Sequence, residues 1–251
     1  MARKRADQLL VERGLVETRA RAQALILAGL AYSGDRRVAK AGDTLPEDAP
    51  LVLKGQDHPW VSRGGLKLDH AIKHFALDAT GRVCIDVGAS TGGFTDVLLT
   101  NGAAKVYAVD VGHGQLAWKQ RSAERVVVLE KTNARALDVT HVPETVDAVV
   151  CDASFIGLKT VLPAALSMCK PGAWAVALIK PQFQAGRSEI GSKGVVRDPA
   201  VHQRVCDDIR EWWSALPGWK VLGIEPSPIT GPAGNRAFLL AARFDGCNLS
   251  P

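Results

Sequence analysis

The sequence of 251 residues lacks any long apolar run, and it also lacks internal repeats and low-complexity segments. No stretch approaches the about 18 consecutive apolar residues that suggest a membrane span, so no membrane role is expected. The basic start, Arg3-Lys4-Arg5, leads into further charged residues instead of the apolar segment of a secretory signal. We therefore expect a globular protein that stays in the cytoplasm.

Cysteine is scarce, and its spacing argues against a zinc centre. No CxxC pair and no Cys/His cluster occurs, whereas structural zinc sites are built from such groups. Isolated cysteines in apolar runs usually fill core space. A bound metal is therefore not expected. The five residues are Cys84, Cys151, Cys169, Cys206 and Cys247.

The positive charge gathers at the N-terminus. The formal net charge is +5, and residues 1–40 alone hold nine Lys/Arg against four Asp/Glu, which is an excess of the same size. A hydrophobic content of 47% is that of a folded protein. The length fits one α/β domain with a small, basic appendage. A polyanionic partner is compatible with this distribution.

Two patterns of secondary structure follow each other along the chain. Helices are predicted over 5–14 and 19–29, the second capped by Thr18, with short strands near 30–33 and 50–53. From residue 80, apolar strands alternate with helices over 92–101, 157–168 and 199–215, which predicts a doubly wound, mostly parallel sheet. The last two strands predict an antiparallel hairpin at its end. The strands expected here are 83–87, 104–110, 125–129, 146–151, 174–179, 221–225 and 237–242.

The segment 86–95 predicts a cofactor site. Asp86 ends the first strand, and Gly88, Gly92 and Gly93 let the backbone approach a ligand before a helix begins. Asp110 ends the next strand, where a carboxylate can accept hydrogen bonds from ribose hydroxyls. The spacing is not GxGxxG, so S-adenosylmethionine is favoured over a dinucleotide, and a purely structural turn is the other alternative. The residues expected to contact the cofactor are Asp86, Gly88, Ser90, Gly92, Gly93, Phe94, Asp110, Asn133 and Asp152; Asn133 could equally cap a turn.

Three charged residues stand where methyl-transfer chemistry needs them. Lys67 lies on a helix before the first strand, Asp152 ends the fourth strand and Lys180 ends the fifth. A ribose hydroxyl must lose its proton as it attacks a methyl carbon, and a lysine beside positive charge can accept that proton. Taken singly, each residue could be a surface charge at a strand end. Together with the glycine loop, they predict a catalytic group.

These motifs resemble the TlyA family of haemolysin-like ribosomal RNA methyltransferases nearly end to end. The resemblance rests on Arg5-Ala6-Asp7, Val61–Gly65, Asp86–Asp96, Asp152–Ile156, Lys180–Phe183 and Gly194–Asp198. It implies a Rossmann-like class I methyltransferase with a seven-stranded, mostly parallel sheet over residues 63–251. It also implies an S-four-type (alpha-L) α+β RNA-binding domain over residues 1–55, with a linker over 56–62. The implied activity is 2′-O-methylation of cytidine in ribosomal RNA, by a protein expected to be a monomer.

One position departs from the family pattern. The resemblance maps a Lys-Asp-Lys-Glu tetrad onto Lys67, Asp152 and Lys180, but Ala237 stands where the glutamate belongs. Either three residues suffice, or Glu225 or Glu189 substitutes, or the chain is an RNA-binding protein with weakened catalysis.

Arginines dominate the residues expected to contact RNA, because the planar guanidinium suits phosphate. The alternative is that they are ordinary solvated helix charges. The expected contacts are Arg5, Arg19, Arg21, Arg36 and Arg37 in the N-terminal region, and Arg63, Lys193 and Arg197 further along.

Overall fold

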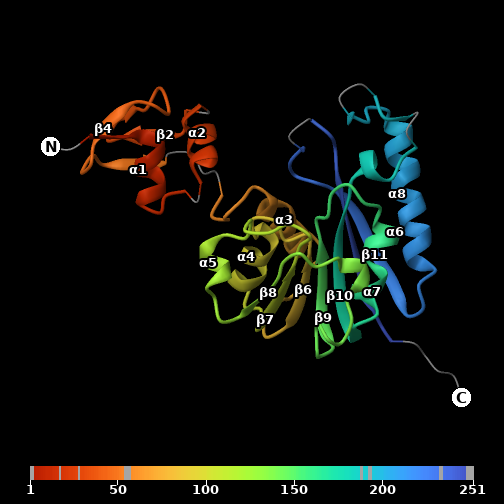
Figure 1. Cartoon of the computed structure of the whole chain (residues 1–251). Coiled ribbons are helices and arrows are strands. Elements are labelled where there is room, and N and C mark those ends of the chain that lie inside the picture. The colour runs from red at the N-terminus through yellow and green to blue at the C-terminus, as the bar shows by residue number, and fades with distance from the viewer. Residues whose placement is uncertain are drawn as a thin grey trace, which may run out of the picture. The chain divides into compact units, whose positions relative to one another are not determined.

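The computed structural model divides into two compact units, residues 1–59 and 60–251 (Figure 1). It describes residues 3–16, 18–27, 29–53, 58–186, 189–191, 194–231 and 234–246. The expected linker, 56–62, runs across this division. Trp60 is only 7% exposed and packs in a core cluster of the second unit, and Val61 N donates to Asp96 Oδ2 at 3.0 Å. Residues 60–62 are therefore part of the second unit.

The first unit packs two helices with short strands. Its elements are β1 (Arg3–Arg5), α1 (Ala6–Glu12), α2 (Arg19–Leu27), β2 (Ala31–Ser33), β3 (Arg36–Arg37), β4 (Thr44–Pro46) and β5 (Leu51–Leu53). β1 pairs antiparallel with β4, and β2 pairs antiparallel with both β3 and β5. Leu9 and Leu10 of α1 pack with Leu25 and Ile26 of α2 in one apolar core.

The predicted helices and strands of this unit occur within a few residues of their expected bounds. Thr18 Oγ1 accepts a hydrogen bond from Arg21 N at 3.2 Å, as expected of an N-cap. β1, β3 and β4 were not predicted. The first two consist wholly of charged residues, so they carry none of the apolar alternation that marks a strand in sequence.

A seven-stranded sheet forms the centre of the second unit. The strand order is β11-β12-β10-β9-β6-β7-β8, in which β10, β9, β6, β7 and β8 are parallel and β12 is antiparallel to β10 and β11. This confirms the predicted doubly wound sheet and its terminal hairpin. The strands are β6 (Val83–Val87), β7 (Lys105–Val109), β8 (Val126–Leu129), β9 (Val146–Cys151), β10 (Cys169–Ile179), β11 (Trp219–Pro226) and β12 (Phe238–Phe244).

Helices cover both faces of this sheet (Figure 1). On one face, α3 (Gly64–His74) and α4 (Gly93–Thr100) pack against inward residues such as Val150 and Trp174. On the other, α6 (Leu158–Val161), α7 (Pro163–Leu166) and α8 (Pro199–Ser214) pack against Val149 and Ile179. Alternate residues of each strand therefore enter different cores, as expected of a sheet buried on both sides. None of the described helices is both long and apolar enough to cross a membrane.

One helical prediction needs correction, and one short helix was not predicted. The single helix expected over 157–168 is divided into α6 and α7, because Pro163 cannot donate the backbone hydrogen bond that would continue a helix. The short helix α5 (Trp118–Arg121) was not predicted, since one turn is too brief to show a helical period. Two 3-10 turns complete the unit: η1 (Ala134–Ala136) and η2 (Pro181–Phe183).

Candidate active site

The strand order places a ligand crevice between β6 and β9. The chain passes from β6 to β7 on one side, while β9 and β10 lie on the other, so the connections diverge between these adjacent parallel strands. Ligands of open α/β sheets bind at such a switch point, beyond the carboxyl ends of the strands. Asp86 is the penultimate residue of β6, and Asp152 directly follows β9. Both predicted acidic residues therefore flank the crevice.

Gly88 brings the loop after β6 against the loop after β9. Its φ is +81°, and a Cβ at this position would lie 2.9 Å from the Cα of Ala153. Asp152 N donates to Val87 O at 3.1 Å on the same side. Any larger residue at position 88 would have to displace backbone. The glycine thus couples the predicted cofactor loop to the predicted catalytic loop.

Asp86 is fully buried and has no basic partner among the residues that the structure describes. Its Oδ2 accepts a hydrogen bond from Thr95 Oγ1 at 2.7 Å, and its Oδ1 has no hydrogen-bond donor among the described residues. Burial is the main cause that raises the pKa of the Asp86 carboxyl to about 7; the Thr95 hydrogen bond opposes this rise, and the charges of Asp152 and Asp110 contribute to it. A cationic group of a ligand would satisfy this carboxylate.

Asp110 connects two loops at the same edge of the sheet. Its Oδ2 accepts from Ser90 N at 2.8 Å and its Oδ1 accepts from Gly112 N at 2.7 Å. Each oxygen retains a second lone pair that could accept from a ribose hydroxyl. Asn133 makes the capping contact that was one of its two expected roles: its Oδ1 accepts from Arg135 N at 3.1 Å.

The remaining loop residues differ in how they could meet a cofactor. Gly92 caps α4 with a φ of +92°. At Gly93, a Cβ would lie 2.4 Å from Ser62 Oγ, so this glycine allows close packing of protein against protein. The Phe94 side chain is 3% exposed within the apolar core, which leaves its main chain as the part nearest the loop surface.

The three predicted catalytic residues meet at the crevice. Lys67 Nζ on α3 lies 2.9 Å from Asp152 Oδ2, and Lys180 Nζ lies 2.7 Å from Asp152 Oδ1. Lys180 Nζ also donates to Ser154 Oγ at 2.8 Å and to the main-chain oxygen of Asp152 at 2.9 Å. The side chains of Lys67, Asp152 and Lys180 are 15%, 18% and 11% exposed. Two cations thus share one carboxylate in a largely buried position.

No second carboxylate contacts these lysines in the described part of the chain. Ala237 packs against the core that includes Leu68 of α3, and its main-chain oxygen accepts from Ser227 N. Glu189 pairs with Arg204 and accepts from Gly186 N at 3.0 Å. Glu225 lies against two histidines of α3 instead of Lys67. The charge that a glutamate at position 237 would supply is therefore missing.

Phe155 is a site feature that the sequence reasoning did not single out. Its side chain is 90% exposed, three residues after Asp152, and its φ of +65° is unusual for a bulky residue. Its ring lies 5.0 Å from that of Phe183, which follows Lys180. An exposed aromatic held in a strained backbone conformation points to a ligand contact.

The predicted RNA contacts are mostly solvent-facing. Arg21, Arg36, Arg37, Arg63 and Arg197 are exposed. Arg5 and Arg19 are about half exposed and contact the buried carboxylate of Asp7. Lys193 lies outside the described residues.

Comparison with known proteins identifies the family. The family model described as FtsJ-like methyltransferase matches residues 60–244, which include the whole crevice. The chain belongs to the FtsJ-like methyltransferase family. This confirms the predicted Rossmann-like methyltransferase fold.

Close relatives of this FtsJ-like methyltransferase extend over both units. It is 45% identical to the 16S/23S rRNA (cytidine-2′-O)-methyltransferase TlyA of Mycobacterium tuberculosis, over 97% of this chain and 91% of the relative. It is 47% identical to the Bacillus subtilis protein YqxC, over 97% and 87%. A solved structure of a hemolysin-type protein from Streptococcus thermophilus superposes with a TM-score of 0.76 at 41% identity, covering 98% of this chain and 90% of that one. The predicted resemblance to the TlyA family is confirmed.

Proposed function

We propose that the protein transfers a methyl group from S-adenosylmethionine to a 2′-hydroxyl of ribosomal RNA, on a cytidine. The observation that carries this proposal is the group formed by Lys67, Asp152 and Lys180, which lies beside the glycine loop at the switch point of a methyltransferase sheet. The named activity of the Mycobacterium tuberculosis relative supports the choice of substrate.

The loops after β6, β7 and β9 would hold the cofactor. The positive-φ backbone at Gly88 and Gly92 would shape the loop that holds it, Asp110 would accept from its ribose, and the unpaired Oδ1 of Asp86 fits its cationic end. Ser90, Gly93, the main chain of Phe94, Asn133 and Asp152 complete the proposed contacts. When bound, S-adenosylmethionine supplies an electrophilic methyl carbon on a positively charged sulfur.

The lysine pair would manage the proton of the 2′-hydroxyl. Lys67 and Lys180 together carry one more positive charge than Asp152 can balance. If one lysine gives up a proton, the three side chains have no net charge in this largely buried position. The neutral amine then accepts the hydroxyl proton as the ribose oxygen forms its bond to the methyl carbon. In this transfer the carbon–sulfur bond of the cofactor would break, and the sulfur would keep the electron pair of that bond. Asp152 orients both amines throughout.

The substrate nucleotide would be held by stacking and by phosphate contacts. We assign the face of the cytosine to the exposed ring of Phe155, because nucleobases stack on aromatic side chains. The exposed Arg63 and Arg197 would contact phosphates of the RNA strand that binds to the second unit. The first unit would act as the S-four-type RNA-binding domain, with Arg5, Arg19, Arg21, Arg36 and Arg37 toward the RNA. The protein would act as a monomer, in the cytoplasm with its ribosomal substrate.

Methyl transfer to unmodified ribosomal RNA tests the proposal. The full chain is incubated with labelled S-adenosylmethionine and with 16S RNA, 23S RNA, each subunit and assembling precursors. The expected product is 2′-O-methylcytidine at one or a few positions, identified by mass spectrometry of nuclease fragments. Label on a base, or no label above background on any of these RNAs, would contradict the proposal.

A further inference from the structure

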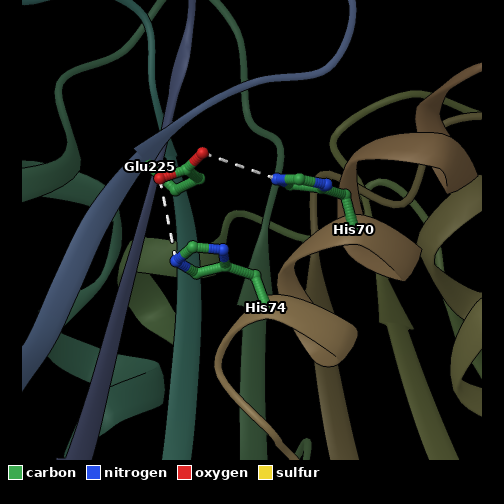
Figure 2. A group of neighbouring side chains, drawn as sticks. All are labelled: His70, His74 and Glu225. Atoms are coloured by element: carbon green, nitrogen blue, oxygen red, sulfur yellow. Dashed lines mark ion pairs between the residues drawn. The ribbon is translucent and has the colours of Figure 1, made fainter.

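Two histidines and a glutamate form a separate cluster on the second unit. His70 and His74 lie one turn apart on α3, a spacing that puts both rings on the same side of the helix. Glu225 comes from β11, far along the sequence. Figure 2 shows both rings directed toward the Glu225 carboxylate. Nothing in the proposed methyl transfer uses these three side chains.

The distances within the cluster are too long for hydrogen bonds. His70 Nε2 lies 3.9 Å from Glu225 Oε1, and His74 Nε2 lies 3.7 Å from Glu225 Oε2. Good N–H···O bonds have heavy-atom distances of about 2.7–3.2 Å. His70 Nε2 is also buried without a hydrogen bond to any described residue. A buried polar atom without a partner is unusual and calls for an explanation.

We propose that His70, His74 and Glu225 bind one divalent metal ion of the zinc class. Their ligand atoms all lie within 4.8 Å of one another. With metal–ligand bonds of about 2.0–2.2 Å, a tetrahedral site holds neighbouring ligand atoms about 3.3 Å apart. Small rotations of the side chains would bring the ligand atoms from their present separations to this spacing. Three protein ligands leave a position for water.

The donor set selects the class of metal. Imidazole nitrogens suit zinc, copper and nickel, whereas magnesium and calcium prefer oxygen ligands throughout. Two histidines at this helical spacing are a known zinc-binding arrangement. The side chains of His70, His74 and Glu225 are 35%, 45% and 33% exposed, so an ion can reach them from solvent. Bound metal would connect α3, which carries Lys67, to β11.

Zinc titration of the full chain tests this proposal. The metal-free protein is titrated with Zn²⁺ in a calorimeter, and Co²⁺ is added separately to follow its visible absorption. We expect one tightly bound equivalent and Co²⁺ bands of four-coordinate geometry. Loss of even an outer partner of a metal ligand typically weakens binding about 10–100-fold. Glu225→Gln and His74→Gln each remove a ligand, so they should weaken binding at least about 100-fold.

The control is His141→Gln, whose ring contacts the nearby Asp138 and Thr140 and lies outside the cluster. Its affinity for Zn²⁺ should equal that of the parent chain. Circular dichroism without metal shows whether each variant is folded, and the two ligand variants serve as independent checks. Absence of a bound equivalent in the parent chain overturns the proposal. So does binding that persists in both folded ligand variants. Neither result affects the proposed methyl transfer.

Discussion

Each unit of the protein places one aspartate between two basic side chains, and the two groups differ in which partner is withdrawn from water. In the first unit the Asp7 side chain is 0% exposed, while those of Arg5 and Arg19 are 43% and 52% exposed. In the second unit Lys67, Asp152 and Lys180 are all less than one fifth exposed. Similar charges therefore have different surroundings.

The difference indicates different roles. Hydrogen bonds from Arg5, and also from Gln23 and Arg19, hold the pKa of the buried Asp7 carboxyl well below its usual range. The guanidinium groups remain near solvent, so this group stabilises the fold and leaves positive charge available for the proposed RNA contacts. In the second unit the lysine amines themselves are shielded from solvent, as suits side chains that are proposed to take up the hydroxyl proton.

Among the substitutions that distinguish the Asp152 group from the Asp7 group, Lys180→Met and Lys67→Met should have the largest effect on methyl transfer. General acid–base catalysis contributes about 10²–10⁴-fold, so single-turnover methyl transfer should fall about 10³-fold or more in each variant. Binding of S-adenosylmethionine, measured by calorimetry, should change only a few-fold. The matched control is Lys159→Met, at an exposed lysine paired with Asp208 at 2.7 Å. A lysine variant with the activity of this control would show that the buried pair is not catalytic.

Asp7→Asn should destabilise the first unit and leave the second unchanged. Breaking a buried ion pair costs about 3–5 kcal/mol, and the half-exposed arginines reduce this to about 2–3 kcal/mol. Hydrogen exchange of the α1 and α2 amides measures the loss, with α8 as an internal reference. The control is Asp48→Asn at an exposed position of the same unit.

The stability that the Asp7 carboxylate contributes to the first unit should depend on pH. The folded-state pKa of Asp7 is lowered, so its stabilising contribution is complete above the ordinary pKa of about 3.9 and is lost as pH falls through the folded value. The difference between the parent chain and Asp7→Asn should therefore be largest at neutral pH and shrink below about pH 4. A constant difference across this range would mean that the ion pairs do not stabilise the unit.

The sheet and the lysine group were predictable because their signals are local. Asp152 and Lys180 each end an apolar strand, and the carboxyl ends of parallel strands meet at one edge. Asp7 gave no such signal, because nothing in its neighbourhood shows that Arg19 and Gln23 converge on it. The histidine cluster was not predicted for the same reason: Glu225 reaches His70 and His74 only through the placement of β11 beside α3, and no CxxC pair in the sequence accompanies these histidines.

Ala237→Glu should have a smaller, favourable effect. The residue lies just before β12, which contacts α3, and a carboxylate there would offset the excess positive charge around Lys67 and Lys180. We expect methyl transfer to rise about 10-fold, which corresponds to about 1.4 kcal/mol. The comparison is Ala237→Gln, which has similar bulk without the charge. Equal rates in both variants and the parent chain would show that three residues suffice.

Arg36→Ala should have the smallest effect, confined to RNA binding. This exposed residue of β3 would contribute one phosphate contact, so affinity should fall only a few-fold and the slope of log affinity against log salt concentration should shrink by about 0.7–0.9. The methyl-transfer rate at saturating RNA should not change, because the residue is proposed to bind RNA and not to take part in the reaction. Lys220→Ala, at an exposed lysine of the second unit paired with Asp245, provides the reference for a lost surface charge. If both variants shift the salt dependence equally, Arg36 contributes no more to RNA binding than a surface lysine of the second unit does. That result would contradict the proposed RNA-binding role of the first unit's arginines.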